Sequence, residues 1–132
     1  MSRLASPRLQ MALVGLLALL LRLIRLDDPL WLDEAAAVLI AWEGPTGAVD
    51  ALARDSTPPL YYWLLWAWTS LVGSTETLVR IPSAVGGVLA VVATMALARR
   101  LAGPRAALIA SLMVALSPLA IYYSREARMY AF

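Results

Sequence analysis

Residues 81–98 read IPSAVGGVLAVVATMALA, a run of eighteen positions without a charged side chain. As a helix rising 1.5 Å per residue, this run spans about 27 Å, close to the ~30 Å hydrocarbon thickness of a bilayer. Residues 106–123 (AALIASLMVALSPLAIYY) form a second apolar run of adequate length. The turn between them, residues 99–105, reads RRLAGPR and carries three positive charges. The two runs therefore predict membrane-spanning helices joined by a cytoplasmic turn, because positively charged loops stay on that side.

The composition also indicates a membrane protein. Of the 132 residues, 61% are hydrophobic and 15% are charged, and the mean hydropathy is +0.73. An ordinary soluble domain has about 25% charged residues, and a short chain cannot bury so much apolar surface in a core of its own. Lipid can solvate what such a core cannot cover.

Charge and residue usage narrow the chemistry. The net charge is +2 and all eleven basic residues are arginines. They are scattered along the chain, which argues against a nucleic-acid-binding surface. The chain has no Cys and no His, so disulfides, thiolate zinc sites and imidazole catalysis are excluded. Any general base must be a carboxylate or a tyrosine.

A further span is expected near the N-terminus, over residues 9–26. Arg3 and Arg8 precede its apolar run, and Arg22 and Arg25 lie at its far end, where long side chains can reach the interface. A secretory signal peptide is the alternative. The continuation is arginine-rich and has no small-residue cleavage pattern close behind, which favours an uncleaved anchor.

Residues 58–72 (PPLYYWLLWAWTSLV) are apolar but extend only about 22 Å as a helix, which suits an interfacial helix better than a span. Their tyrosines and tryptophans are typical of the headgroup level. Placing this segment in the interface also keeps the turn at 99–105 in the cytoplasm. Residues 33–42 (DEAAAVLIAW) predict a second helix lying on the membrane, ended by Gly44 and Pro45.

The expected fold class is thus all-α and integral to the membrane, with residues 1–132 forming a single partial domain. Three transmembrane helices cover about 9–26, 81–98 and 106–123, and interfacial helices cover about 33–42 and 58–72. In this arrangement the acidic residues gather in two external segments. The first runs from residue 27 to residue 80, and the second follows residue 123.

Asp33 and Glu34 are the first candidates for chemistry. A structural interpretation is available, because two acids at a helix start are favoured by the helix dipole. The functional interpretation makes one carboxylate a general base held just above the bilayer. Neighbouring helical residues point in different directions, so only one of the two is expected to face a cleft.

Glu126 is the second candidate, flanked by Arg125 and Arg128 directly after a span. These residues suit a solvated interfacial belt, but guanidinium groups also match a phosphate head group, and the carboxylate could hold a divalent cation or position a hydroxyl. Asp55, which precedes Thr57 and two prolines, could contribute to the same external layer. Capping of a helix start fully explains the residue types at that third position, which favours the structural interpretation there.

Several motifs occur in an order that resembles the N-terminal region of bacterial type C membrane glycosyltransferases, related to protein O-mannosyltransferases and aminoarabinose transferases (the glycosyltransferase 39 type). The resemblance covers residues 9–132. The motifs are Leu30-Trp31-Leu32-Asp33-Glu34, Pro58-Pro59-Leu60-Tyr61-Tyr62, Val79-Arg80-Ile81-Pro82-Ser83-Ala84, Arg99-Arg100-Leu101-Ala102-Gly103 and Tyr122-Tyr123-Ser124-Arg125-Glu126-Ala127-Arg128-Met129-Tyr130.

The resemblance implies an enzyme of the bacterial inner membrane that moves a sugar from a polyprenyl-phosphate donor to a glycan, lipid or protein acceptor. Transfer would occur on the extracytoplasmic face with inversion. The family's acidic base corresponds to Asp33, with Glu34 beside it. Glu126 and Arg128 correspond to the second external loop, which borders the active site. No nucleic-acid partner is implied.

Two departures accompany the resemblance. Many relatives carry His immediately before the paired prolines, where this chain has Thr57. Relatives also have several further spans, so a partial sequence is expected. A non-catalytic membrane module, such as a transporter fragment or scaffold subunit, is the alternative function. Transporters place ionisable residues inside their spans, whereas the runs at 81–98 and 106–123 have none, which favours the enzyme.

Overall fold

The computed structural model describes residues 6–53 and 57–131, and every regular element in these two ranges is a helix. This confirms the all-α prediction. The elements in chain order are α1 (Pro7–Leu23), α2 (Leu32–Trp42), α3 (Gly44–Leu52), α4 (Leu60–Val72), α5 (Glu76–Leu116), α6 (Pro118–Tyr123) and the 3₁₀ helix η1 (Met129–Ala131).

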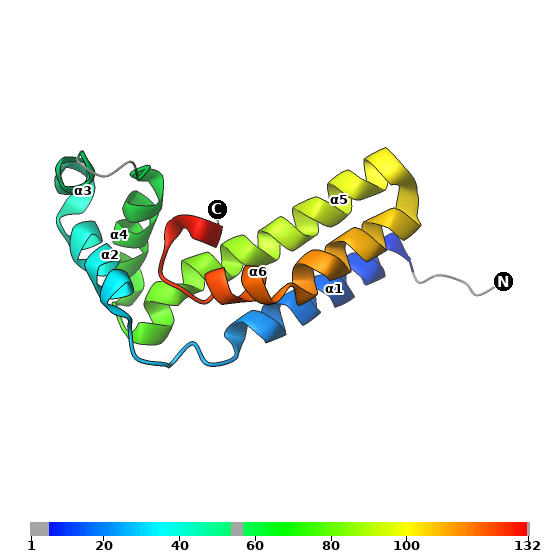
Figure 1. The fold of residues 1–132 in the computed structure, drawn as a ribbon, viewed down its shortest axis with the longest axis horizontal. Helices are drawn as coiled ribbons and strands as arrows, with labels where there is room; N and C mark the ends of the chain where they lie inside the picture. The colour runs from blue at the N-terminus through cyan, green and yellow to red at the C-terminus, as the bar shows by residue number, and fades with distance from the viewer. Residues whose placement is uncertain (1–5, 54–56, 132) are drawn as a thin grey trace.

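Helix α5 is a hairpin. Its backbone leaves the helical region at Gly103, where φ is 86° and ψ is 179°, and Pro104 follows. Glycine adopts a positive φ without a steric penalty, and proline begins the returning helix well. Figure 1 shows the two arms of α5 running side by side, with α1 lying along them. Val14 and Ala18 of α1 pack against Val91 and Ala115 from the two arms.

Helices α2, α3 and α4 form a second cluster at the open end of the hairpin (Figure 1). Its core includes Val38 and Ala41 from α2, Leu52 from α3 and Leu65 from α4. Val79 at the start of α5 and Ala127 from the C-terminal segment belong to the same core. Residues as far apart in the sequence as Val38 and Ala127 therefore meet at this end of the molecule.

One element has the length and composition that crossing a membrane requires. Among the described residues, α5 alone is long and apolar enough to cross a bilayer. The three predicted spans remain a prediction. An apolar stripe on α1 is consistent with a lipid-facing helix, since Leu9, Leu13, Leu16, Leu20 and Leu23 are each exposed and recur every three or four residues.

Two predicted helices have different limits in the structure. Helix α1 ends at Leu23 rather than near residue 26, because Ile24 is extended and Arg25 is left-handed with φ 61°. The apolar run at 106–123 is interrupted at Ser117, whose hydroxyl accepts a hydrogen bond from the backbone N–H of Ala120 and caps α6. Pro118 cannot donate a backbone hydrogen bond, which favours this break.

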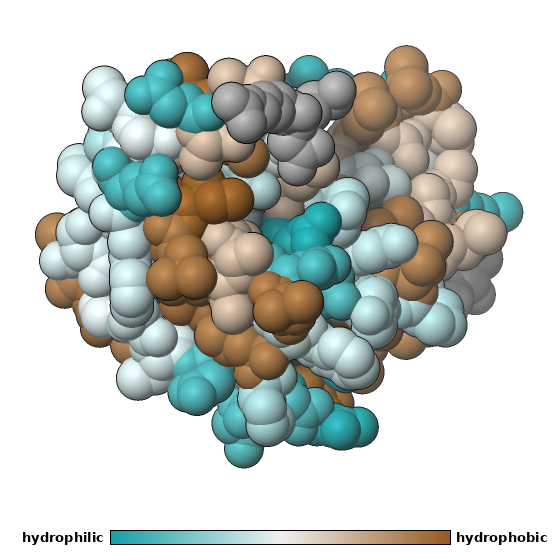
Figure 2. All heavy atoms as spheres, turned by 60° about the vertical axis from the view of Figure 1, so that its left-hand side comes forward, coloured by the Kyte–Doolittle hydropathy of each residue, from teal (hydrophilic) through white to brown (hydrophobic). Residues whose placement is uncertain are grey.

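The segment at 58–72 is helical as α4, from Leu60 to Val72. Its buried face carries Tyr61, Tyr62 and Leu65, whereas Trp63 and Trp66 are exposed. Figure 2 views the end of the molecule formed by α2–α4 and shows hydrophobic residues interspersed with hydrophilic ones. A mixed surface of this kind is consistent with an interfacial position, which stays a prediction.

Candidate active site

The site is built on the first turn of α2. Trp31 precedes the helix in an extended conformation, and Asp33 and Glu34 follow in its first turn. The backbone N–H of Trp31 donates to Glu34 Oε2 at 3.0 Å. A carboxylate here satisfies a backbone donor at the helix start and is favoured by the helix dipole. Stabilisation of the helix start therefore explains why an acid occupies position 34.

Glu34 also forms a buried ion pair with Arg80 of α5. Arg80 donates from Nε to Glu34 Oε1 at 2.9 Å and from Nη2 to Glu34 Oε2 at 2.6 Å. The two side chains are only 4% and 2% exposed for Arg80 and Glu34, respectively. The remaining donors of Arg80 reach backbone carbonyls of the segment between α1 and α2, at Leu26, Asp28 and Pro29.

The same carboxylate binds the C-terminal segment, because the backbone N–H of Ala127 donates to Glu34 Oε1 at 2.8 Å. Burial raises the pKa of Glu34, but the hydrogen bonds from Arg80, Ala127 and Trp31 outweigh it and hold this pKa below the ordinary value of 4.5. Glu34 is therefore charged, and both of its carboxylate oxygens accept hydrogen bonds that connect α2, α5 and the C-terminal segment.

Asp33 is placed differently from its neighbour. Its side chain is 74% exposed, and its Oδ2 lies 2.9 Å from Nη1 of Arg128. Arg128 in turn donates from Nη2 to the hydroxyl of Tyr130 at 3.0 Å, and its backbone carbonyl accepts a hydrogen bond of 3.2 Å from Ser83. Asp33 thus combines an accessible carboxylate with a partner whose position is held by α5.

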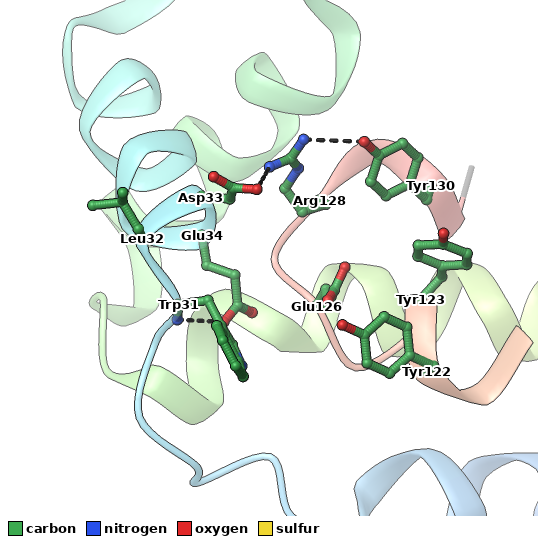
Figure 3. Close-up of a pocket in the computed structure, with 9 residues that line it drawn as sticks. All are labelled: Trp31, Leu32, Asp33, Glu34, Tyr122, Tyr123, Glu126, Arg128 and Tyr130. Carbon is green, nitrogen blue, oxygen red and sulfur yellow. Dashed lines mark hydrogen bonds and ion pairs between the residues drawn. The ribbon is translucent and has the colours of Figure 1, made fainter. Parts of the chain in front are cut away.

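A cavity of about 370 Å³ lies between the start of α2 and the C-terminal segment. Figure 3 shows the paired side chains of Asp33 and Arg128 along its upper edge, with Glu126 and Tyr122 on the side opposite Trp31. We call it the acidic chamber. Its lining residues are Trp31, Leu32, Asp33, Glu34, Tyr122, Tyr123, Glu126, Arg128 and Tyr130.

Tyr122 and Glu126 both line this chamber. A tyrosine hydroxyl is protonated at neutral pH and can donate a hydrogen bond, and a carboxylate can accept one. Aromatic rings beside carboxylates give the chamber both apolar walls and hydrogen-bonding groups, a combination typical of ligand sites.

A second cavity of about 250 Å³ adjoins the first. We call it the arginine chamber. It shares Trp31, Glu34, Tyr122 and Glu126 with the acidic chamber. Its own lining residues are Arg25, Asp28, Arg80 and Arg125.

The structure brings most of the predicted site residues together. Asp33, Glu34, Glu126 and Arg128 line the acidic chamber, and Arg125 lines the adjoining one. Asp55 lies outside the described residues. Within the described part of the chain, no group of three or more Asp, Glu, His or Cys side chains could hold a metal ion.

Sequence reasoning did not assign roles to Arg80 and Ser83, which hold Glu34 and the Arg128 backbone. The sequence did indicate that Arg80 needs a partner, because it directly precedes an apolar run, where a charged side chain must be paired. Trp31 and Tyr130 were also missed. Their places in the chamber depend on contacts between distant segments, which no local pattern encodes.

Residues 56–131 match the model of the dolichyl-phosphate-mannose-protein mannosyltransferase family. This segment covers more than half of the chain. The chain belongs to this family. Its members are membrane proteins, and the function at family level is glycosyl transfer of the mannosyltransferase type. The matched segment contains Arg80, Ser83, Glu126 and Arg128 and begins after Asp33 and Glu34. Comparisons with curated proteins and with solved structures found no match.

Proposed function

We propose that this chain carries the acceptor-activating part of a glycosyltransferase that uses a polyprenyl-phosphate-linked sugar. One observation carries the proposal. Asp33 and Glu126, 93 positions apart in the sequence, line a single chamber with aromatic walls in a chain of the mannosyltransferase family.

In the proposed reaction, Asp33 is the general base. Its carboxylate accepts the proton of an acceptor hydroxyl while that oxygen attacks the anomeric carbon of the donor sugar. The bond between the anomeric carbon and the phosphate oxygen breaks, and the carrier phosphate leaves with the electron pair. Attack opposite the leaving group inverts the configuration. The extracytoplasmic face and the bilayer-embedded donor are parts of the same proposal.

The contrast between the two acids supports Asp33 as the base. A general base must lie within hydrogen-bond reach of the proton that it removes. The carboxylate of Asp33 is 74% exposed, whereas that of Glu34 is 2% exposed and accepts four hydrogen bonds from Arg80, Ala127 and Trp31. Glu34 is then a positioning residue that keeps the C-terminal segment, and with it Arg128, against α2.

Replacement of Asp33 tests the proposal. The protein is assayed in membranes with a polyprenyl-phosphate sugar donor and a hydroxyl acceptor. Asp33→Asn removes the basic oxygen with little change of shape, and we expect kcat to fall by about 100-fold or more, the usual contribution of a general base. Asp50→Asn, at an exposed position of α3, is the matched control and should retain wild-type turnover. Unchanged turnover in Asp33→Asn would refute the assigned role.

A further inference from the structure

The arginine chamber contains a guanidinium group that forms no ion pair with any described residue. Arg80 is paired with Glu34, and Arg25 is paired with Asp28 at 3.0 Å. Arg125 has no ion pair within the described residues. Its Nη2 donates to the carbonyl of Leu21 at 2.6 Å, and its Nε is buried without a hydrogen-bond partner in that part of the chain.

Buried donors are nearly always satisfied, so an orphaned guanidinium nitrogen beside a cavity indicates a missing partner. Guanidinium groups bind phosphate oxygens through two parallel hydrogen bonds. We propose that the arginine chamber binds the phosphate of the polyprenyl-linked donor against Arg125, while the sugar extends into the acidic chamber. This inference rests on the proposed function and adds the orientation of the donor to it.

The charges of the two chambers set this orientation. The acidic chamber presents the carboxylates of Asp33 and Glu126, and its arginine, Arg128, is already paired with Asp33. Glu126 lines both chambers, so the difference between them is Asp33, whose carboxylate would repel a phosphate placed in the acidic chamber. Arg125, which has no ion pair among the described residues, lines the adjoining chamber and not the acidic one.

The two chambers suit a ligand that crosses from one to the other. They share four lining residues, and their volumes of about 250 and 370 Å³ are suited to a phosphate group and a monosaccharide, respectively. A donor whose phosphate binds Arg125 would place its sugar beside Trp31 and Tyr122. The anomeric carbon then lies between the leaving phosphate and the side of the cleft that carries Asp33.

The position of Arg125 also suits a lipid carrier. Its hydrogen bond to Leu21 fixes it at the last turn of α1. Leu20, Leu23 and Ile24 are exposed around this end of the helix. A prenyl chain attached to a phosphate at Arg125 could therefore leave along an apolar helix surface toward lipid.

Binding of the carrier without its sugar tests the placement. A short-chain polyprenyl monophosphate is titrated against the chain in lipid nanodiscs, and binding is followed by ³¹P NMR. Charged hydrogen bonds of this type contribute enough that Arg125→Gln should weaken the affinity about 10-fold or more. Arg100→Gln makes the same charge change on the exposed turn of α5 and should bind as the wild type does. Inorganic phosphate should bind far more weakly than the prenylated probe, and equal affinities would assign the site to free phosphate instead.

Several outcomes would overturn the placement. Unchanged affinity in Arg125→Gln is one, and a loss in Arg128→Gln equal to that in Arg125→Gln is another, since it would put the phosphate in the acidic chamber. If Arg125→Gln does not fold, Arg125→Lys replaces it. Lysine keeps the positive charge but cannot form two parallel hydrogen bonds to a phosphate, so the affinity of this variant for the carrier should fall severalfold. Wild-type affinity in Arg125→Lys would refute the proposal.

The inference and the proposed function can fail separately. Sugar transfer that depends on Asp33, combined with carrier affinity that is insensitive to Arg125, would reject the orientation alone. Absence of both carrier binding and sugar transfer in the wild-type chain would reject the two together.

Discussion

At the scale of single residues, two adjacent carboxylates have opposite environments. Successive helical residues point about 100° apart, since 3.6 residues complete a turn. Glu34 consequently points into the contact with Arg80 and Ala127, and Asp33 points toward the open chamber. Removing one partner of a buried ion pair leaves an uncompensated charge and costs about 3–5 kcal/mol, whereas an exposed ion pair contributes about 1 kcal/mol or less.

This contrast predicts a specific pH dependence of stability. The pKa of Glu34 is lowered in the folded protein, so its contribution to stability is present above its ordinary pKa of 4.5 and is lost as the pH falls toward the lower folded value. Thermal unfolding in detergent should show a falling midpoint below about pH 4.5. Glu34→Gln should lower the midpoint at neutral pH and flatten this acid dependence.

Asp33→Asn is the matched control for that experiment, because it changes the neighbouring carboxylate in the same way at an exposed position. Its unfolding midpoint should stay close to that of the wild type at neutral pH. Equal destabilisation by the two substitutions would contradict the assignment of Glu34 as the residue whose buried ion pair with Arg80 stabilises the fold.

At the scale of elements, the hairpin of α5 and its contact with α1 position the C-terminal segment. The close approach occurs at Gly87 on the first arm of α5. A Cβ there would overlap Ser124 Oγ and lie 2.6 Å from Arg22 Nε. Arg22 is fully buried and donates from this Nε to Ser124 Oγ at 3.1 Å. A glycine is therefore needed where α1, α5 and the residue before Arg125 meet.

Gly87→Ala should destabilise the protein by about 1–3 kcal/mol, the usual cost of overpacking, and should weaken carrier binding because Ser124 shifts Arg125. The comparison is Gly15→Ala in α1, where the added Cβ would meet Val92 at an ordinary contact distance of 3.7 Å. That variant should be neutral or more stable, since alanine favours helix by up to about 1 kcal/mol over glycine. Equal stability of the two variants in chemical denaturation would show that the contact at Gly87 is not tight.

At the scale of the whole molecule, the site lies where two helical clusters join. The long bundle of α1 and α5 carries Arg80 and Ser83 at its open end, and the α2–α4 cluster carries Asp33 and Glu34. The turn at 99–105 lies at the opposite end of the hairpin (Figure 1). If α5 crosses the bilayer twice, the site and this turn must lie on opposite sides of it.

Single cysteines can test this topology, because the chain has none of its own. Asp50→Cys in α3 and Arg100→Cys in the turn both lie at exposed positions. In intact cells, a membrane-impermeant maleimide should label Asp50→Cys directly and Arg100→Cys only after permeabilisation. The cysteine-free wild type controls for background. Labelling of both variants from the outside would refute the predicted arrangement.

Part of the site could be predicted from sequence because it is local. The acids at the start of α2 and the Arg125-Glu126-Ala127-Arg128 segment stand out by charge beside apolar runs. The roles within each group could not be assigned. Asp33 and Glu34 have the same chemistry and adjacent positions, and only the packing of Arg80 and Ala127 against Glu34 distinguishes the proposed base from the proposed positioning residue.

The sequence by itself determined that the chain is helical and apolar, where its long apolar runs lie, and which acids and arginines border them. These properties follow from composition and periodicity, which act over a few residues. Only the tertiary structure decided that Asp33 shares a chamber with Glu126, that Arg80 neutralises Glu34, and that Arg125 is left without an ionic partner among the described residues. Those facts depend on contacts between segments 46 to 104 residues apart, and such contacts arise only when the helices pack.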